Sequence, residues 1–502
     1  MKVIGSVAMV TLMAKLLGFV REALQARTFG TEQIVDVYTA AYNSTDYLFT
    51  TIGYALCIAA IPIITQKLRV NRAEGFAAAN NIICVTVGFS LLVMVAGLIF
   101  PYSTLIYGQV DAVSLAWFSR VLMLTLPVVV ATYLFLALLQ SLEHYMLQGS
   151  LSLPYNIFLI GFLALAAGRT GMEGYVVAVA AAWLLQFAMV VPQLYREQYR
   201  FRPSFDLRAP YMGKYIKTAA VTVFTTTTYL FCYLMDTSAG AAAGEGVVSA
   251  FYYADKFFTP IVTTLVYSIS IVMFPKFNFR YVDSSESEYK SYVWNVAEKT
   301  VMLLLPLSAI FAVFAVPVVK VMFEGGSFDA ESTVTTGRIL YFYLAGMTGF
   351  ALLDILAKAF YTMGKVLIPL VVNLAVLALN LVLNYFCFYY PQGSGLAFAT
   401  SLSLTLGAVV LACLFFRGMP GKMRGLLRIG KSLLATVIIA VPLLFFYSNF
   451  VNIGDRKLFL VGECLLAGAV AFILYLLICS WMGEKEMLQT ITRKLRRKKN
   501  AA

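Results

Sequence analysis

Residues 366–389, VLIPLVVNLAVLALNLVLNYFCFY, and residues 395–416, GLAFATSLSLTLGAVVLACLFF, decide the fold class. Each run is long enough to meet the requirement of roughly 20 apolar residues for a helix that crosses a bilayer, and neither contains a charged side chain. A short turn with proline and glycine separates the two runs. Because helices that are apolar on every side are buried or lie in a membrane, this pair predicts two consecutive transmembrane helices.

The rest of the chain repeats this pattern. Hydrophobic residues make up 61% of its 502 residues and charged residues 13%, against roughly 45–50% and about 25% in soluble proteins. Mean hydropathy is +0.81. We therefore predict an all-α polytopic membrane protein with about 14 transmembrane helices, at residues 4–28, 34–64, 76–101, 115–142, 151–168, 174–195, 211–236, 246–275, 294–322, 332–362, 366–389, 395–416, 429–449 and 457–482.

Lysine and arginine in the loops predict the orientation, because cytoplasmic loops are rich in both. The loops after even-numbered spans contain Lys67, Arg69, Arg72, Arg196, Arg200, Arg202, Arg208, Lys276, Arg280, Lys290, Lys365, Arg417, Lys422, Arg424 and Arg428. The loops after odd-numbered spans contain only Arg169, Arg456 and Lys457. We expect a multi-pass protein of the bacterial cell membrane with both termini in the cytoplasm, and a basic tail that faces lipid headgroups.

An internal duplication divides the predicted spans. TTIGYALCIAAIP at Thr50–Pro62 aligns with TTLVYSISIVMFP at Thr263–Pro275, with identities that include both threonines, a tyrosine and the final proline. Parallel repeats of this kind are common in transporters, where the two halves enclose the substrate site. We predict a six-helix bundle at 1–208, a second at 209–420, two further helices at 421–484 and a basic cytoplasmic tail at 485–502.

Composition also excludes several classes of function. The one histidine, His144, offers no imidazole cluster for a zinc site or for acid–base catalysis. The seven cysteines lie in apolar stretches without CxxC spacing, which is typical of core residues. The predicted outer loops have roughly a dozen residues or fewer, which argues against an enzyme that processes a lipid-linked glycan outside the membrane. Basic residues form short clusters between apolar runs, so we expect no nucleic-acid partner. Transport is the favoured function.

Ionisable residues inside the predicted spans are candidates for a site, because a charge at mid-bilayer costs about 2.5–3.5 kcal/mol. Lys15 and Arg21 lie in the first span, Asp36 and Asp46 in the second, and Asp255 and Lys256 in the eighth. One interpretation is a hydrated, cation-rich cavity for an anionic headgroup. The other is a set of structural ion pairs. Asp354 and Lys358, four residues apart on one helix, are interpreted as a structural pair.

A second candidate set is rich in oxygen. Asn380 and Asn384 share a helix face in LNLVLN, Thr400 and the backbone of Leu396 lie early in the next span, and Asp236 ends the seventh. Hard oxygen ligands suit Na⁺ better than a transition metal. The alternative is that the asparagines only form hydrogen bonds with neighbouring helices.

The chain resembles the MurJ (MviN) lipid II flippases of the multidrug/oligosaccharidyl-lipid/polysaccharide exporter superfamily. The resemblance rests on KLLGFVREALQARTFG at 15–30, VDVYTAAY at 35–42, YYADKF at 252–257, FEGGSFDAESTVTTGRILYFYLAG at 323–346 and AKAFYTMGKVLIP at 357–369. It covers nearly the whole chain. It implies transfer of undecaprenyl-pyrophosphate-linked peptidoglycan precursor, lipid II, from the inner to the outer leaflet by alternating access, for cell wall synthesis.

The resemblance also implies which residues bind. The substrate set is Lys15, Arg21, Asp36, Asp255 and Lys256, and the sodium set is Asp236, Asn380, Asn384, Leu396 and Thr400. Lys15 and Lys256 stand where family members commonly have arginine, and Asn384 replaces an acid. Where many members have an arginine pair in the second span, this chain reads TDYLFTTIGYAL at 45–56, without lysine or arginine.

Other functions remain as alternatives. The missing arginines leave open a flippase for another polyprenyl-linked oligosaccharide, of exopolysaccharide or O-antigen type. A cation-coupled drug exporter is a third hypothesis, but buried cations suit cationic drugs poorly. A membrane glycosyltransferase or ligase is a fourth, and the short outer loops argue against it. We expect no catalytic residues and no cofactor other than Na⁺ as a coupling ion, with a lipid-linked anionic glycan and membrane lipid as partners.

Overall fold

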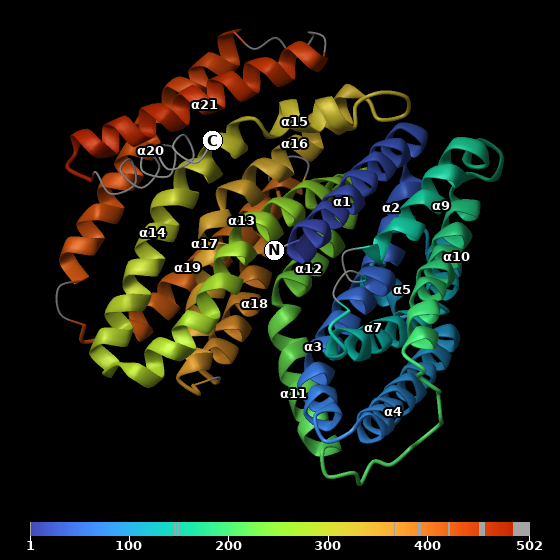
Figure 1. The fold of residues 1–502 in the computed structure, drawn as a ribbon. Helices are drawn as coiled ribbons and strands as arrows, with labels where there is room; N and C mark the ends of the chain where they lie inside the picture. Colours follow the sequence, from blue (N-terminus) through green and yellow to red (C-terminus); the bar gives the residue numbers. More distant parts are fainter. Residues whose placement is uncertain are drawn as a thin grey trace. The chain divides into compact units, whose positions relative to one another are not determined.

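The structure, a computed structural model, describes residues 2–144, 147, 150–365, 367–389, 393–419, 422–450 and 457–484. Within these ranges the chain is helical and contains no strand, apart from an isolated bridge between Gly325 and Phe328 (Figure 1). The predicted all-α class is confirmed. The basic tail at 485–502 lies outside the described residues.

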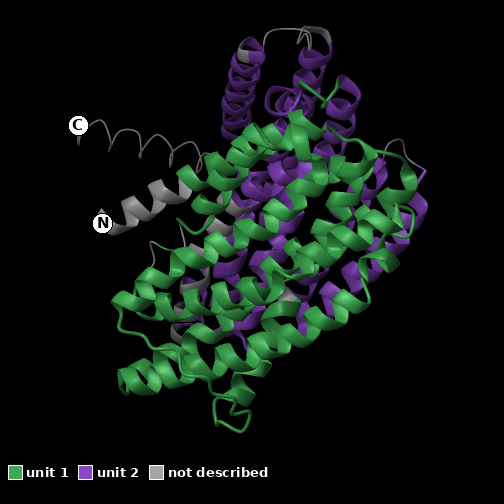
Figure 2. Ribbon diagram, turned by 90° about the vertical axis from the view of Figure 1, so that its right-hand side faces the viewer, with its two compact units in different colours: residues 1–252, 325–329 green, residues 253–324, 330–502 purple. Residues whose placement is uncertain are grey.

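The chain divides into two compact units (Figure 2). Unit 1 comprises Met1–Tyr252 and Gly325–Asp329, and unit 2 comprises Tyr253–Glu324 and Ala330–Ala502. The border falls inside one helix, Val247–Asp283, which contributes its first turns to unit 1. Unit 1 also holds residues 209–246, although the predicted first bundle ends at residue 208. The two units are defined by contacts within the structure, whereas the predicted bundles are defined by a sequence repeat. The division into units therefore does not test the predicted bundles, which stay a prediction.

The helices follow in chain order. Unit 1 contains α1 (Lys2–Phe29), α2 (Gln33–Tyr42), the π-helix η1 (Asn43–Tyr47), α3 (Leu48–Leu68), α4 (Arg72–Ile99), α5 (Ser103–Ile106), α6 (Ala112–Met123), α7 (Leu126–Ser141), α9 (Ser152–Leu165), α10 (Ala167–Arg196), α11 (Met212–Thr226), α12 (Thr228–Ala243) and the start of α13 (Val247–Asp283). Unit 2 contains the rest of α13 and α14 (Glu286–Val313), α15 (Ala315–Met322), α16 (Ala330–Ala345), α17 (Met347–Thr362), α18 (Leu367–Cys387), α19 (Ser394–Phe415), α20 (Lys422–Phe450) and α21 (Lys457–Trp481).

Every predicted span coincides with one helix or with consecutive helices. Among the described residues, nine helices are long and apolar enough to cross a membrane, or eleven if each of two bent helix pairs counts as one span. Helix α1 carries several charges, and α9 has 14 residues. A count based on length and hydropathy therefore leaves both helices out. The chain is a multi-pass membrane protein, and the number fourteen stays a prediction.

Close helix packing holds unit 1 together. Helix α3 packs against α4, α7 and α11. A methyl group added at Gly53 would lie 2.6 Å from the ring of Tyr133. Glycine at this position therefore lets α3 and α7 approach closely, as small residues commonly do between membrane helices.

A turn from a distant part of the sequence, Gly325–Asp329, completes unit 1. The Ser327 amide donates to the Arg27 carbonyl at 3.0 Å, at the end of α1. Gly326 has φ +61°, and a Cβ there would lie 2.2 Å from the same carbonyl oxygen. The FEGGSFD motif therefore requires glycine for both its backbone conformation and its contact with α1.

In unit 2, α20 and α21 pack against each other and against α14. The Tyr475 hydroxyl donates to the Met302 carbonyl at 2.7 Å. Arg428 forms ion pairs with Glu298 at 3.2 Å and with Glu484 at 3.4 Å. Both helices expose many large apolar side chains, including Phe445 and Leu466. This pattern is typical of a surface that faces lipid.

Candidate functional site

Arg21, on α1, is a buried cation of unit 1. Its guanidinium forms an ion pair with the adjacent Glu22 and lies over the Tyr155 ring, 5.2 Å from the centroid. Glu22 also accepts a hydrogen bond from the Tyr252 hydroxyl at 2.9 Å. Glu22 and the Tyr155 ring therefore hold the guanidinium in place. No described group accepts a hydrogen bond from Arg21 Nε, so this buried donor is available to an anionic ligand. Lys15, six residues earlier on α1, is exposed.

Asp36, on α2, binds the first turn of α13. Its carboxylate accepts from the Gly246 amide at 2.7 Å, the Ser249 amide at 2.8 Å and the Ser249 hydroxyl at 2.5 Å. Backbone N–H groups at a helix start have no partner within the helix, and a carboxylate there also interacts favourably with the helix dipole. These contacts give Asp36 a structural role, while contact with a substrate stays a prediction.

In unit 2, Asp255 and Lys256 lie next to each other on α13. Asp255 is buried and accepts from the Thr259 hydroxyl at 2.8 Å, one turn further along the helix. Lys256 is half-buried. Elsewhere in this unit, Lys358 and Asp354 form an ion pair at 2.8 Å, which confirms the predicted structural pair on α17.

The structure brings four members of the predicted sodium set together in unit 2. The Asn380 amide on α18 donates to Thr400 Oγ1 on α19 at 2.7 Å, and the Asn384 amide donates to Asn380 Oδ1 at 3.5 Å. Leu396 lies in the first turn of the same α19 and is fully buried. These neutral oxygens fit a weakly held hard cation, because they lie close together in a buried place. Asp236, on α12, belongs to unit 1, where it is fully buried.

In unit 1, the sequence pointed to Asp46 by its charge inside a predicted span, whereas a group of tyrosines was not predicted. Asp46 accepts a hydrogen bond from the Trp183 indole at 2.6 Å and is buried. Near Arg21, the rings of Tyr38 and Tyr42 of α2, Tyr175 of α10 and Tyr252 of α13 are linked by contacts, and the Tyr155 ring of α9 lies against the guanidinium. Tyr229 and Tyr233 of α12 stack on each other. The chain has 30 tyrosines, and their four-residue spacings at 38/42 and 229/233 were the available signal.

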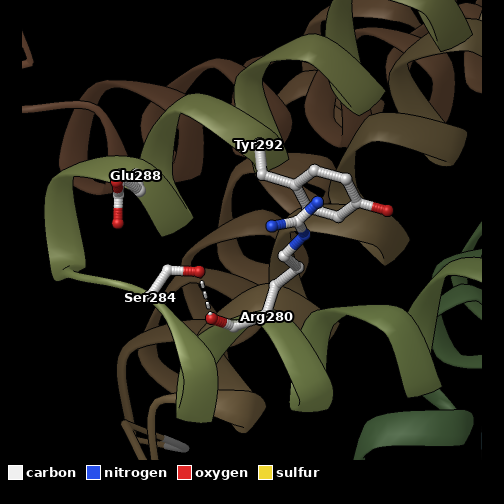
Figure 3. A pocket seen from close by; sticks show the side chains of 4 residues that line it. All are labelled: Arg280, Ser284, Glu288 and Tyr292. Carbon is white, nitrogen blue, oxygen red and sulfur yellow. Dashed lines mark hydrogen bonds between the residues drawn. The ribbon is translucent and has the colours of Figure 1, made fainter.

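A hollow at the turn between α13 and α14 contains no predicted site residue. It has a volume of about 390 Å³ and is lined by Arg280, Ser284, Glu288 and Tyr292 (Figure 3). The Arg280 guanidinium lies 5.5 Å from the centroid of the Tyr292 ring, and the Ser284 hydroxyl donates to the Arg280 carbonyl at 2.7 Å. Glu288 accepts from the Ser285 amide at 3.0 Å. These contacts stabilise the helix turn and give this hollow a structural explanation.

Glu197, directly after α10, joins His144 and Arg72. His144 Nε2 lies 2.7 Å from the Glu197 carboxylate, and Arg72 forms an ion pair with it. The hydrogen bond from His144, together with that from Arg72, holds the pKa of Glu197 below its ordinary value of 4.5. A lowered carboxylate pKa adds stability above the unfolded pKa, and this stability is lost as the pH falls through the folded pKa.

We expect Glu197→Gln to lower the melting temperature of the purified protein at about pH 7 and to make little difference at about pH 3. The stabilisation is about 1 kcal/mol or less, because Arg72 and His144 are partly exposed. Thermal unfolding across this pH range measures it. An equal loss of melting temperature at both pH values would show that the charge of Glu197 does not act in this way.

Comparisons with known proteins agree with these features. Residues 25–468 match the family model described as "Lipid II flippase MurJ". A probable lipid II flippase MurJ of Buchnera aphidicola subsp. Schizaphis graminum is 25% identical over 466 residues, which cover 89% of each chain. A solved lipid II flippase MurJ in an inward-closed conformation shares the fold with a TM-score of 0.78 at 17% identity, over 96% of this chain and 99% of that one. An inward-facing MATE-family multidrug transporter of the MOP superfamily has a TM-score of 0.64 at 13% identity, over 85% and 98%.

Proposed function

Because the chain belongs to the lipid II flippase MurJ family, we propose that it moves undecaprenyl-pyrophosphate-linked peptidoglycan precursor from the inner to the outer leaflet of the bacterial cell membrane, for cell wall synthesis. Arg21 is the observation that carries the proposal. It is a buried guanidinium with a donor that no described group uses, in the first of the spans predicted from the sequence. A phosphate group is one of the anions with which such a donor forms strong, charge-assisted hydrogen bonds.

The neighbours of Arg21 support a reversible site. Glu22 pairs with the guanidinium, so the site without cargo holds no isolated buried charge. An incoming pyrophosphate would share the guanidinium with Glu22, which lowers the net gain on binding and eases release. Lys15 and Lys256 would add positive charge as point charges, without the bidentate geometry of arginine. The prenyl tail would stay in lipid while the headgroup crosses by alternating access.

The proposal includes orientation and coupling. The lysine and arginine distribution supports both termini in the cytoplasm. Asn380, Asn384, Thr400 and the Leu396 carbonyl of unit 2 would hold Na⁺ through oxygen atoms. The resemblance adds Asp236, of unit 1, to this set as its one carboxylate. Coupling to Na⁺ would supply a driving force. No covalent chemistry is proposed, because transfer between leaflets leaves the cargo unchanged.

Growth rescue tests the proposal. Bacteria depleted of their own lipid II flippase are expected to grow when this chain is present in the membrane at a verified level. Lipids that co-purify with the protein, identified by mass spectrometry, are expected to include lipid II. Failure of rescue at normal expression, with a different polyprenyl-linked oligosaccharide co-purifying, would contradict lipid II as the cargo and favour the exopolysaccharide alternative.

A further inference from the structure

The π-helix η1 brings Tyr42 and Tyr47 together. In an α-helix, residues five apart point about 140° away from each other, because one turn takes 3.6 residues. The wider π turn returns the fifth residue to nearly the same side. The two rings are stacked accordingly, with centroids 6.5 Å apart and planes inclined by 20°. Single π turns are rare and often occur at functional sites.

Two fully buried tyrosines pack against the rings of this pair. The ring of Tyr42 makes an edge contact with Tyr252, with centroids 5.6 Å apart, and the ring of Tyr47 makes one with Tyr233 at 5.9 Å. Tyr233 and Tyr252 are almost inaccessible, whereas Tyr42 and Tyr47 are half-buried. The pair is therefore a rigid aromatic platform with part of its surface open.

Buried polar groups surround the platform. Asn43 lies within the π turn, and its amide donates to the Tyr233 hydroxyl at 3.4 Å. Gln25 Oε1 accepts from the Tyr175 hydroxyl at 2.9 Å and from the Tyr252 hydroxyl at 3.5 Å. Both side chains are fully buried, yet in the described residues Asn43 Oδ1 and Gln25 Nε2 have no hydrogen-bond partner. Buried polar atoms of this kind usually have a partner, so one acceptor and one donor are available to a ligand.

The absence of positive charge in the predicted second span indicates the chemistry of the ligand. Residues 45–56, TDYLFTTIGYAL, contain no lysine or arginine, so they offer no cation to a phosphate. A pyranose ring instead has an apolar C–H face and a rim of hydroxyl groups. The aromatic rings suit the C–H face, and the two amide atoms without a partner, Asn43 Oδ1 and Gln25 Nε2, suit the hydroxyl groups. Buried Arg21 and Asp46 belong to the same unit, and charged groups of this kind favour polar partners over lipid tails.

We propose that Tyr42 and Tyr47 stack against a pyranose ring of the lipid-linked cargo, and that Asn43 and Gln25 bind its polar substituents. This inference rests on the proposed function and adds recognition of the glycan to recognition of the pyrophosphate. Arg21 then sets affinity for any undecaprenyl pyrophosphate, while the tyrosine pair sets the preference for cargo that carries sugar.

Binding to the full-length protein in nanodiscs tests the division of roles. The probes are undecaprenyl pyrophosphate and lipid II, and the readout is the ratio of their dissociation constants. Tyr47→Leu is expected to reduce the preference for lipid II about three- to tenfold, from the usual size of an aromatic stacking contact. Tyr47→Phe keeps the ring face and is expected to keep the ratio. Tyr195→Leu, at an exposed tyrosine at the end of α10, is the matched control.

The outcomes separate the two proposals. A ratio that Tyr47→Leu leaves unchanged, with Tyr42→Leu giving the same result, would overturn the stacking proposal and leave the flippase proposal standing. If the wild-type chain binds neither lipid, the proposed function itself fails. Arg21→Lys is expected to weaken both probes alike and so to leave the ratio unchanged. Should Tyr47→Leu fold poorly, the ratio measured for Tyr42→Leu decides whether the tyrosine pair stacks on sugar, with Tyr47→Phe as the variant that keeps the ring.

Discussion

Replacing Arg21 with alanine is expected to abolish growth rescue in bacteria depleted of their own lipid II flippase. A hydrogen bond to a charged group contributes about 1.5–3 kcal/mol, so loss of the guanidinium should weaken pyrophosphate binding by about tenfold to a hundredfold. Arg27→Ala is the matched control on the same helix. Its side chain is exposed, and the turn at Gly325–Asp329 uses its backbone carbonyl. Growth with Arg27→Ala should equal that of the parent.

Folding and binding must be separated at Arg21, because alanine there leaves Glu22 as a buried charge without its cation. Breaking a buried ion pair from one side costs about 3–5 kcal/mol. The double variant Arg21→Gln, Glu22→Gln removes both charges and keeps groups that form hydrogen bonds. We expect it to reach the membrane at the parent's level and still fail to rescue growth. Rescue by this double variant would show that Arg21 is not needed to bind the cargo.

Local composition was sufficient to predict the fold class. Each long apolar run between proline, glycine and charged clusters is helical as predicted, because a bilayer imposes length and hydropathy on each span separately. The short helix α5 at Ser103–Ile106 lies between predicted spans and was missed. Breaks inside spans were not predicted. The π turn at Asn43–Tyr47 and the bend of 42° between α16 and α17 lie inside continuous apolar runs, where hydropathy does not mark a break. The count of spans is therefore harder to predict than their positions.

The candidate site was predicted in part. Charge inside apolar runs pointed to Arg21, Asp36 and Asp255, all of which are buried. Their contacts could not be predicted, because they depend on which helices meet. Asp36 binds the start of α13, more than two hundred residues away. The tyrosine platform was missed because Tyr42 and Tyr47 share a side of the helix only when one turn has π geometry.

Asp36→Ala is expected to cause the largest loss of stability in unit 1. The change leaves the amides of Gly246 and Ser249 and the Ser249 hydroxyl without their acceptor, in a buried place. It also removes a negative charge from the start of α13, so the cost should reach about 3 kcal/mol or more. Asp36→Asn keeps one side-chain oxygen and should lose about half as much. Thermal unfolding of the purified protein measures both.

Asp111 is the matched control for this prediction. It is also an aspartate at a helix start in unit 1, and it accepts from the Val113 and Ser114 amides at 3.3 Å and 3.2 Å, but it is exposed. Water can replace an exposed cap, so Asp111→Ala should cost only about 0.5–2 kcal/mol. If Asp36→Ala is no more damaging than Asp111→Ala, burial of the cap does not matter and Asp36 is free to serve the cargo. The expected order, Asp36→Ala above Asp36→Asn above Asp111→Ala, would instead assign its carboxylate to the fold and leave Arg21 as the main ligand of the pyrophosphate in unit 1.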